Sequence, residues 1–247
     1  METLTAIKDQ ICDVCQKMWQ LGWVAANDGN VSARLADGRI IATPTGISKS
    51  FITPEKLVLL DSQGHVLEAG EGLRPSSEIK MHLRCYEKRP DVQSVIHAHP
   101  PGATGFAVAH KAMDMYNMIE DVAVIGAVPL TPYGTPSTQE VPDAIEPYLE
   151  EHDVMLLENH GALAVGSDVL TAFYRMESLE LWAKITINAV ILGGSWDISR
   201  ENIQKLIDLR SYYQVTGRHP GYRQFNPQDP LLHKNEAPDS EEPTHSN

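Results

Sequence analysis

Two histidines one residue apart stand at the end of an apolar run in residues 95–103, VIHAHPPGA. Side chains alternate between the two faces of a strand, so His97 and His99 are expected on one side and Ala98 on the other. At that spacing two neutral imidazoles can converge on a single metal ion. Histidine pairs also occur in strands for structural reasons, and these two residues alone favour a structural role over metal binding.

A third histidine and a glutamate strengthen the case for a metal site. His160 ends the apolar run of LLENHGALAVG and precedes Gly161, and Glu78 follows two serines in RPSSEIKMH. Three imidazoles and one carboxylate, with a position left for substrate or water, commonly hold catalytic zinc. Glu78 taken alone is explained better by the macrodipole at the start of a predicted helix. His82 shares a helix face with Glu78, and a structural or supporting role is favoured over metal ligation.

Three turns rich in small residues could bind a phosphate group. They are NDGNVS (27–32), TPTG (43–46) and PSS (75–77). Each offers backbone N–H groups, hydroxyls or side-chain amides, although each is more often simply a turn. Neither G-x-x-x-x-G-K-[ST] nor a G-x-G-x-x-G after a strand is present, so the sequence carries no nucleotide motif.

Composition limits the possible partners. The 20 basic and 33 acidic residues give a net charge of −13, which disfavours nucleic acid and anionic membranes as partners. No apolar run reaches the roughly 18–20 residues that span a bilayer, and the first residues lack a signal-peptide pattern, so a cytoplasmic location is expected. Three cysteines argue against a disulfide framework, and the pair Cys12 and Cys15 is expected to fill the core.

The elements that must position these residues follow from periodicity and turn signals. We predict a single α/β domain over residues 1–225, with a central, mostly antiparallel sheet covered by helices on both faces, and a flexible tail over 226–247. The helix over 75–88 is expected to have Ser76 or Ser77 as its N-cap. The other predicted helices cover 3–21, 168–192 and 199–215, with another starting near residue 101. The predicted strands are two hairpins over 31–43 and 57–69, followed by 92–99, 122–130, 154–159 and 161–166.

Five motifs in this order resemble the class II aldolase/adducin family: GNVSARL, TPTG, PSSEIKMH, VIHAHP and NHGALAVG. The resemblance extends from the first helix to about residue 215. It implies a homotetramer with sites at subunit interfaces and one zinc ion per subunit. The implied zinc ligands are His97, His99 and His160, with Glu78 both touching the metal and acting as acid/base. The phosphate of a sugar-phosphate substrate would be held by Gly29, Asn30, Thr45, Gly46, Ser76 and Ser77. Two catalytic tyrosines of the family would correspond to Tyr116 and Tyr212.

The activity that the resemblance implies is retro-aldol cleavage of a ketose 1-phosphate between C3 and C4. The products would be dihydroxyacetone phosphate and an aldehyde, from L-fuculose 1-phosphate or a related 5-deoxypentulose 1-phosphate. A sugar-phosphate decarboxylase, a 4-epimerase or a dehydratase could use the same zinc site. The family's epimerases resemble SSD where this chain has SSE, which favours an aldolase. A non-enzymatic, adducin-like binding module is disfavoured because the three histidines and Glu78 are all present.

Overall fold

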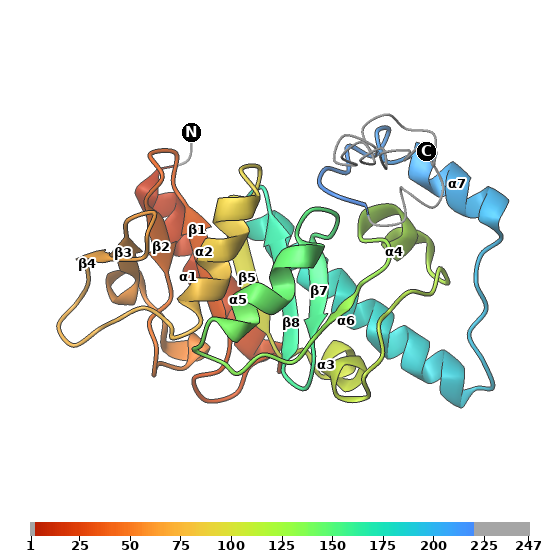
Figure 1. Cartoon of the computed structure of the whole chain (residues 1–247), viewed down its shortest axis with the longest axis horizontal. Helices are drawn as coiled ribbons and strands as arrows, with labels where there is room; N and C mark the ends of the chain where they lie inside the picture. Colours follow the sequence, from red (N-terminus) through yellow and green to blue (C-terminus); the bar gives the residue numbers. More distant parts are fainter. Residues whose placement is uncertain (1–2, 220–247) are drawn as a thin grey trace, which may run out of the picture.

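A computed structural model, described here for residues 3–219, contains one eight-stranded sheet between two layers of helices (Figure 1). The sheet has the order β4-β3-β2-β1-β5-β8-β7-β6, and every pairing is antiparallel except that of β6 with β7. The strands are β1 Asn30–Arg34, β2 Ile40–Ala42, β3 Val58–Leu60, β4 Val66–Glu68, β5 Ser94–Ala98, β6 Leu130–Thr131, β7 Val154–Leu157 and β8 Gly161–Gly166. The predicted α/β class, with a mostly antiparallel sheet, is confirmed.

Helices cover both faces of the sheet. One face packs against α1 (Leu4–Gln20), α3 (Pro101–Val108) and α6 (Val169–Ile191), and the other against α2 (Ile79–Lys88) and α5 (Glu140–Ile145). Beyond the β7 side of the sheet, α4 (Ile119–Val124) and α7 (Arg200–Asp208) pack against each other (Figure 1). Three short 3-10 helices complete the set: η1 Lys49–Phe51, η2 Pro54–Lys56 and η3 Glu146–Tyr148.

Alternation along the central strands divides the core into two layers. In β5, Val95 joins the core under α2 and α5, whereas Ile96 and Ala98 join the core under α1 and α6. His97 has the same parity as Val95 and therefore faces the α2 layer. In the neighbouring β1, Val31 packs on the α6 side, so Asn30 and its partner in register, His97, share the α2 side.

The predicted boundaries hold best where capping signals are strong. The hydroxyl of Thr3 accepts the N–H of Ala6 at the start of α1, and Asp168 caps α6 through Thr171. Both predicted hairpins are present, as β1–β2 and β3–β4. The last helix is shorter than the predicted 199–215, because α7 ends at Asp208.

The predicted strand over 122–130 is wrong. Residues Ile119–Val124 form α4, and Val128 makes only an isolated bridge to Met113 before the two-residue strand β6. A short apolar run fits a buried helix as well as a strand. Acidic Glu120 and Asp121 in the first turn favour the helix, and Gly126, with φ of +72°, lies just past its end.

The cysteines are free, and two of them fill the core as predicted. Cys15 is completely buried on α1, where burial raises its pKa to about 12, and Cys12 packs partly buried against the same cluster. Within residues 3–219 no helix has both the length and the apolar character needed to cross a membrane. The tail predicted over 226–247 lies outside the described residues.

Candidate active site

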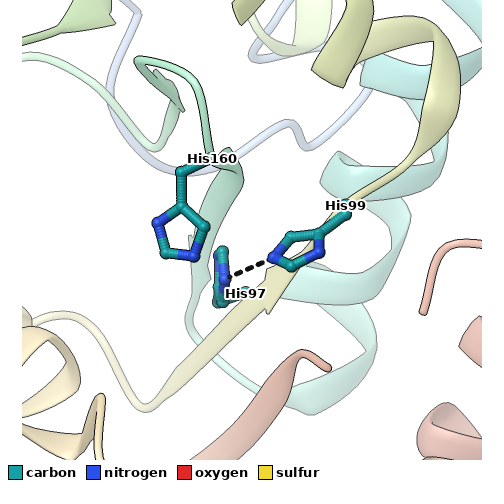
Figure 2. A group of neighbouring side chains, drawn as sticks. All are labelled: His97, His99 and His160. Carbon is teal, nitrogen blue, oxygen red and sulfur yellow. Dashed lines mark hydrogen bonds between the residues drawn. The ribbon is translucent and has the colours of Figure 1, made fainter. Parts of the chain in front are cut away.

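Three imidazoles converge where β5 ends and β8 begins (Figure 2). His97, His99 and His160 each offer a ring nitrogen, and these nitrogens all lie within 4.8 Å of one another. Nε2 of His97 is 3.1 Å from Nε2 of His99. The expected shared strand face needs one correction, because β5 ends at Ala98 and His99 lies one residue beyond it. The ring of His99 nevertheless turns back toward His97.

The backbone around His99 is held from three sides. Its N–H donates to the carbonyl of Trp23 at 2.9 Å. After the two prolines, the buried carboxylate of Glu180 on α6 accepts the N–H groups of Gly102 and Ala103, at 3.0 and 2.9 Å, and so caps α3. A Cβ on Gly161 would lie 2.6 Å from Cδ2 of His99, so only glycine allows this close approach.

Glu78 lies directly beside the imidazoles. Its Oε1 is 3.3 Å from Nε2 of His160, and its Oε2 is 3.5 Å from Nε2 of His97. The predicted N-cap at Ser76 or Ser77 is wrong, because Glu78 itself occupies the N-cap of α2. The hydroxyl of Ser76 instead accepts the N–H of Glu78 within the preceding turn, a local bond that serine favours outside helices. Glu78 is therefore free to turn toward the histidines.

Electrostatics make these side chains suitable ligands for a cation. Burial, followed by the neighbouring imidazoles, holds the pKa of His97 well below its usual value, and burial also lowers the pKa of His99. Both rings are therefore neutral near pH 7. Nδ1–H of His97 donates to the carbonyl of Ala162 at 2.9 Å, which leaves the Nε2 lone pair directed at the cluster.

The histidine cluster contains acceptor atoms that no donor in the described residues satisfies. Oε1 of Glu78 is buried and accepts no hydrogen bond within the described residues, while His97 and His99 bring two ring nitrogens to 3.1 Å. Asp28 lies on the far side of His99, 3.7 Å from Nδ1. A cation between the rings would satisfy these acceptors, and a set of three imidazoles and a carboxylate fits zinc. The residues therefore fit a metal ion.

A cavity of about 180 Å³ opens beside the imidazoles. Its lining includes Glu78, His99 and His160, together with five of the six residues predicted to bind phosphate: Gly29, Asn30, Thr45, Ser76 and Ser77. Gly46 is adjacent in sequence but does not line the cavity. Gly29 has a φ of +70°, and a Cβ there would lie 2.9 Å from the carbonyl oxygen of His97. The glycine is thus required for the turn to approach β5.

Lys49 was missed by the sequence analysis. Its side chain is fully buried, and its ammonium donates to the carbonyls of Asn27 and Ile47, at 3.3 and 3.2 Å. It thereby links the turn NDGNVS to the residue that follows TPTG, and burial lowers the pKa of Lys49. Lysine in a polar stretch normally indicates a solvated side chain, so the sequence offered no signal for this role.

Neither tyrosine lies in the cavity of its own chain. Tyr116 packs with Val122, Ile203 and Ile207 in the cluster between α4 and α7, where burial raises its pKa. Tyr212 is 77% exposed and contacts mainly the ring of Tyr213. The described chain therefore brings together the histidines, Glu78 and most of the phosphate-suited residues, but not the tyrosines.

Comparison with known proteins finds sugar-phosphate aldolases and a decarboxylase among the relatives of this chain. The L-fuculose phosphate aldolase of Escherichia coli K12 is 30% identical over 183 residues, covering 74% of this chain and 83% of that protein. A 5-methylthioribulose-1-phosphate/5-deoxyribulose-1-phosphate aldolase of Escherichia coli O45:K1 is 34% identical, covering 64% and 73%. A 3-oxo-tetronate 4-phosphate decarboxylase of Haemophilus influenzae is 31% identical, covering 73% and 86%.

A solved structure and a family model extend the comparison. An L-fuculose 1-phosphate aldolase structure, 27% identical in sequence, superimposes with a TM-score of 0.77 over 84% of this chain and 97% of the other. Residues 9–187 match the model described as the class II aldolase and adducin N-terminal domain. The matched range contains the positions of the three histidines, Glu78 and all three phosphate-suited turns. The chain belongs to the class II aldolase and adducin family.

Proposed function

We propose that this protein is a zinc-dependent aldolase that cleaves a ketose 1-phosphate to dihydroxyacetone phosphate and an aldehyde. One observation carries the proposal: Glu78, His99 and His160 line the same cavity as residues of the phosphate-suited turns. A substrate with a phosphate next to a carbonyl would bridge the two. Class II aldolases are metal-dependent, and the histidine triad could bind the metal.

His97, His99 and His160 would hold zinc, with Glu78 as a further ligand before substrate binds. When bound, zinc would supply a Lewis acid at the substrate carbonyl, where negative charge builds up as the carbon–carbon bond breaks. The low pKa values of His97 and His99 keep their rings available as ligands at neutral pH.

The protein's own groups would orient the substrate and move one proton. The turns at Gly29–Asn30, Thr45–Gly46 and Ser76–Ser77 would bind the phosphate through backbone N–H groups and hydroxyls. As the C3–C4 bond breaks, C4 becomes the aldehyde carbon, its hydroxyl loses a proton, and the bonding electron pair remains on C3. Glu78 would return a proton to C3, which completes dihydroxyacetone phosphate.

Coupled detection of dihydroxyacetone phosphate tests the proposal. The substrates are L-fuculose 1-phosphate, ribulose 1-phosphate and 5-deoxyribulose 1-phosphate, each at several concentrations. Release from at least one is expected, and a Glu78→Gln variant should lose it while retaining its fold. If none of the three yields dihydroxyacetone phosphate, the aldolase assignment is wrong.

A decarboxylase is the second candidate, and the Haemophilus influenzae relative favours it. Loss of carbon dioxide also leaves an electron pair beside a carbonyl, so the same site could serve both reactions. Carbon dioxide release from 3-oxo-tetronate 4-phosphate, without dihydroxyacetone phosphate from any ketose 1-phosphate, would select this alternative.

We further propose a cytoplasmic homotetramer with sites at subunit interfaces. Support comes from three free cysteines and from large apolar side chains that are exposed near the end of α6, namely Val190, Ile191, Leu192 and Trp196. In such an assembly Tyr116 and Tyr212 would act on the aldehyde end of a substrate in a neighbouring subunit's cavity. Sedimentation velocity measures the oligomeric state.

A further inference from the structure

A chain of buried hydrogen bonds leads away from the carboxylate of Glu78. Nδ2 of Asn30 donates to Oε2 of Glu78 at 2.9 Å, and Oδ1 of Asn30 lies 2.5 Å from Nε2 of His82. On the other side of that ring, Nδ1 of His82 lies 2.7 Å from Oγ of Ser32, which lies 2.7 Å from the hydroxyl of Tyr86. The fold explains this arrangement. Glu78, His82 and Tyr86 are spaced by four along α2, and Asn30 and Ser32 share the facing side of β1.

The chemistry of the groups gives the chain one direction. The amide nitrogen of Asn30 donates to Glu78, so the amide oxygen of Asn30 faces His82. His82 must then donate from Nε2, and because burial lowers its pKa to about 3, the ring is neutral and Nδ1 accepts. Ser32 therefore donates to His82 and accepts from the hydroxyl of Tyr86.

The far end of the chain is fixed to the body of the protein. The guanidinium of Arg34 lies 5.1 Å from the ring centre of Tyr86 and donates to its carbonyl at 2.9 Å. His82, Ser32 and Tyr86 are all buried, with exposed fractions of 1%, 0% and 5%. Neither the imidazole nor the phenol can therefore turn without breaking a hydrogen bond in the interior.

We propose that His82 is a positioning residue that, backed by Ser32 and Tyr86, locks the amide of Asn30 in one orientation. One N–H of that amide then holds Glu78 in place, and the second is available to a phosphate oxygen in the cavity that Asn30 lines. The chain thus links the group that moves the proton to the group that binds the anion. This inference rests on the proposed function of the site, and His82 touches neither substrate nor metal.

Two substitutions at His82 separate the two ends of its ring. His82→Gln keeps an N–H that can reach Asn30 and gives up the bond to Ser32. His82→Asn is one methylene shorter, so it can meet Ser32 but does not reach Asn30. Both variants remove the same buried ring, which makes each a control for the other in loss of packing. Cys85→Ala, at a fully buried residue of α2 outside the chain, controls for general damage to the helix.

Binding of inorganic phosphate, measured by calorimetry on the metal-loaded full-length protein, is the first readout. His82→Asn should weaken phosphate binding by about 10–100-fold, whereas His82→Gln and Cys85→Ala should change it less than about threefold. Equal dissociation constants for the His82→Gln and His82→Asn variants would overturn the proposal. So would an unsubstituted protein that binds no phosphate, because the amide would then have no anion to meet.

A second readout is exchange of the C–H proton of dihydroxyacetone phosphate with deuterated solvent. The His82→Asn variant should lower kcat and raise KM for this exchange together, since Glu78 and the phosphate would both be misplaced. If the His82→Asn variant does not fold, Tyr86→Phe replaces it. Ser32 then loses the hydroxyl that donates to it, and phosphate binding should weaken about 2–5-fold. Unchanged phosphate binding in Tyr86→Phe would overturn the proposal. Failure of the unsubstituted protein to cleave any ketose phosphate would refute the proposed function but leave the phosphate comparison intact.

Discussion

Two buried polar clusters lie at opposite ends of β8, and they are built on opposite principles. At the end near Gly166, the carboxylate of Asp153 is paired on both oxygens, with Arg89 at 2.7 Å and Arg175 at 2.9 Å, and it also accepts the N–H of Arg218. At the end near Gly161, three imidazoles and Glu78 face one another, and Oε1 of Glu78 accepts no hydrogen bond within the described residues.

The difference separates a structural cluster from a ligand site. In the arginine cluster donors match acceptors, so the cluster needs nothing from outside and ties β7, α2 and α6 together. In the histidine cluster, Oε1 of Glu78 and the facing ring nitrogens are acceptors that the described residues do not match with donors, an imbalance that a bound ligand would remove. Burial alone does not identify a functional site, because the arginine cluster is the more deeply buried of the two. The imbalance of hydrogen-bond donors and acceptors is what distinguishes the histidine cluster.

Removing the shared carboxylate of the arginine cluster should have the largest effect on stability. Asp153→Asn leaves Arg175 buried with its charge uncompensated and Arg89 paired only with Asp91, and the free energy of unfolding should fall by about 3–5 kcal/mol. Urea denaturation measures this loss. Asp91, which also pairs with Arg89 but is half exposed, provides the control: Asp91→Asn should cost at most about 1 kcal/mol. Equal losses for the two variants would show that the paired cluster is not a structural core.

Asp121 offers a test of the same principle outside both clusters. It is buried on α4 with Oδ1 unpartnered in the described structure, and burial raises its pKa from 3.8 to about 7. The folded protein therefore keeps a proton that the unfolded chain releases, so stability from this group falls as the pH rises from about 4 to 7. Asp121→Asn should add about 2–4 kcal/mol at pH 8 and almost nothing at pH 4. Denaturation at both pH values checks this, and a pH-independent effect would contradict it.

Glu180 connects the structural layer to the histidines. Glu180→Gln removes the charge that caps α3 and leaves one acceptor for two N–H groups, which should cost about 1–2 kcal/mol of stability. Because the same cap fixes the segment after His99, zinc should also bind more weakly. Lys184→Met, which removes the exposed partner of Glu180, should leave zinc affinity unchanged. Unchanged zinc affinity in Glu180→Gln would show that the cap does not position His99.

The smallest effect on stability is expected at Glu78. In metal-free protein, Glu78→Gln removes a carboxylate that lacks a full set of partners, so the free energy of unfolding should change by less than about 1 kcal/mol. A loss as large as that of Asp153→Asn would mean that the histidine cluster is structural after all. Denaturation in the presence of a chelator makes the comparison.

Local signals predicted most of the fold and the centre of the site. Helix periodicity located α1 and α6, and the histidine pair at the end of β5, together with His160 and Glu78, indicated the metal cluster. The region over 119–131 could not be predicted, because its short apolar run fits either a helix or a strand until neighbouring elements decide. The position of Glu78 at the N-cap likewise depends on the tertiary contact with His97 and His160, which no local pattern encodes.

Long-range pairing explains what the sequence left open in the site. Lys49 can donate to the carbonyls of both Asn27 and Ile47 only because the fold brings these two segments together. His82 shares a helix face with Glu78, a spacing visible in the sequence. Its link to Asn30 appears only once β1 lies against α2. Tyr116 and Tyr212 lie apart from the cavity in the single chain, so the role proposed for them requires a neighbouring subunit, which one sequence does not describe.

Zinc titration into chelator-treated protein tests the central claim most directly, with His97→Ala as the matched variant. Isothermal calorimetry should show one zinc ion bound per chain in the unsubstituted protein, and thermal denaturation should show a higher melting temperature with zinc bound. His97→Ala should lose that stoichiometric binding while the metal-free variant remains folded. Full zinc stoichiometry in the His97→Ala variant, or no zinc binding by the parent, would contradict a metal centre built from these histidines.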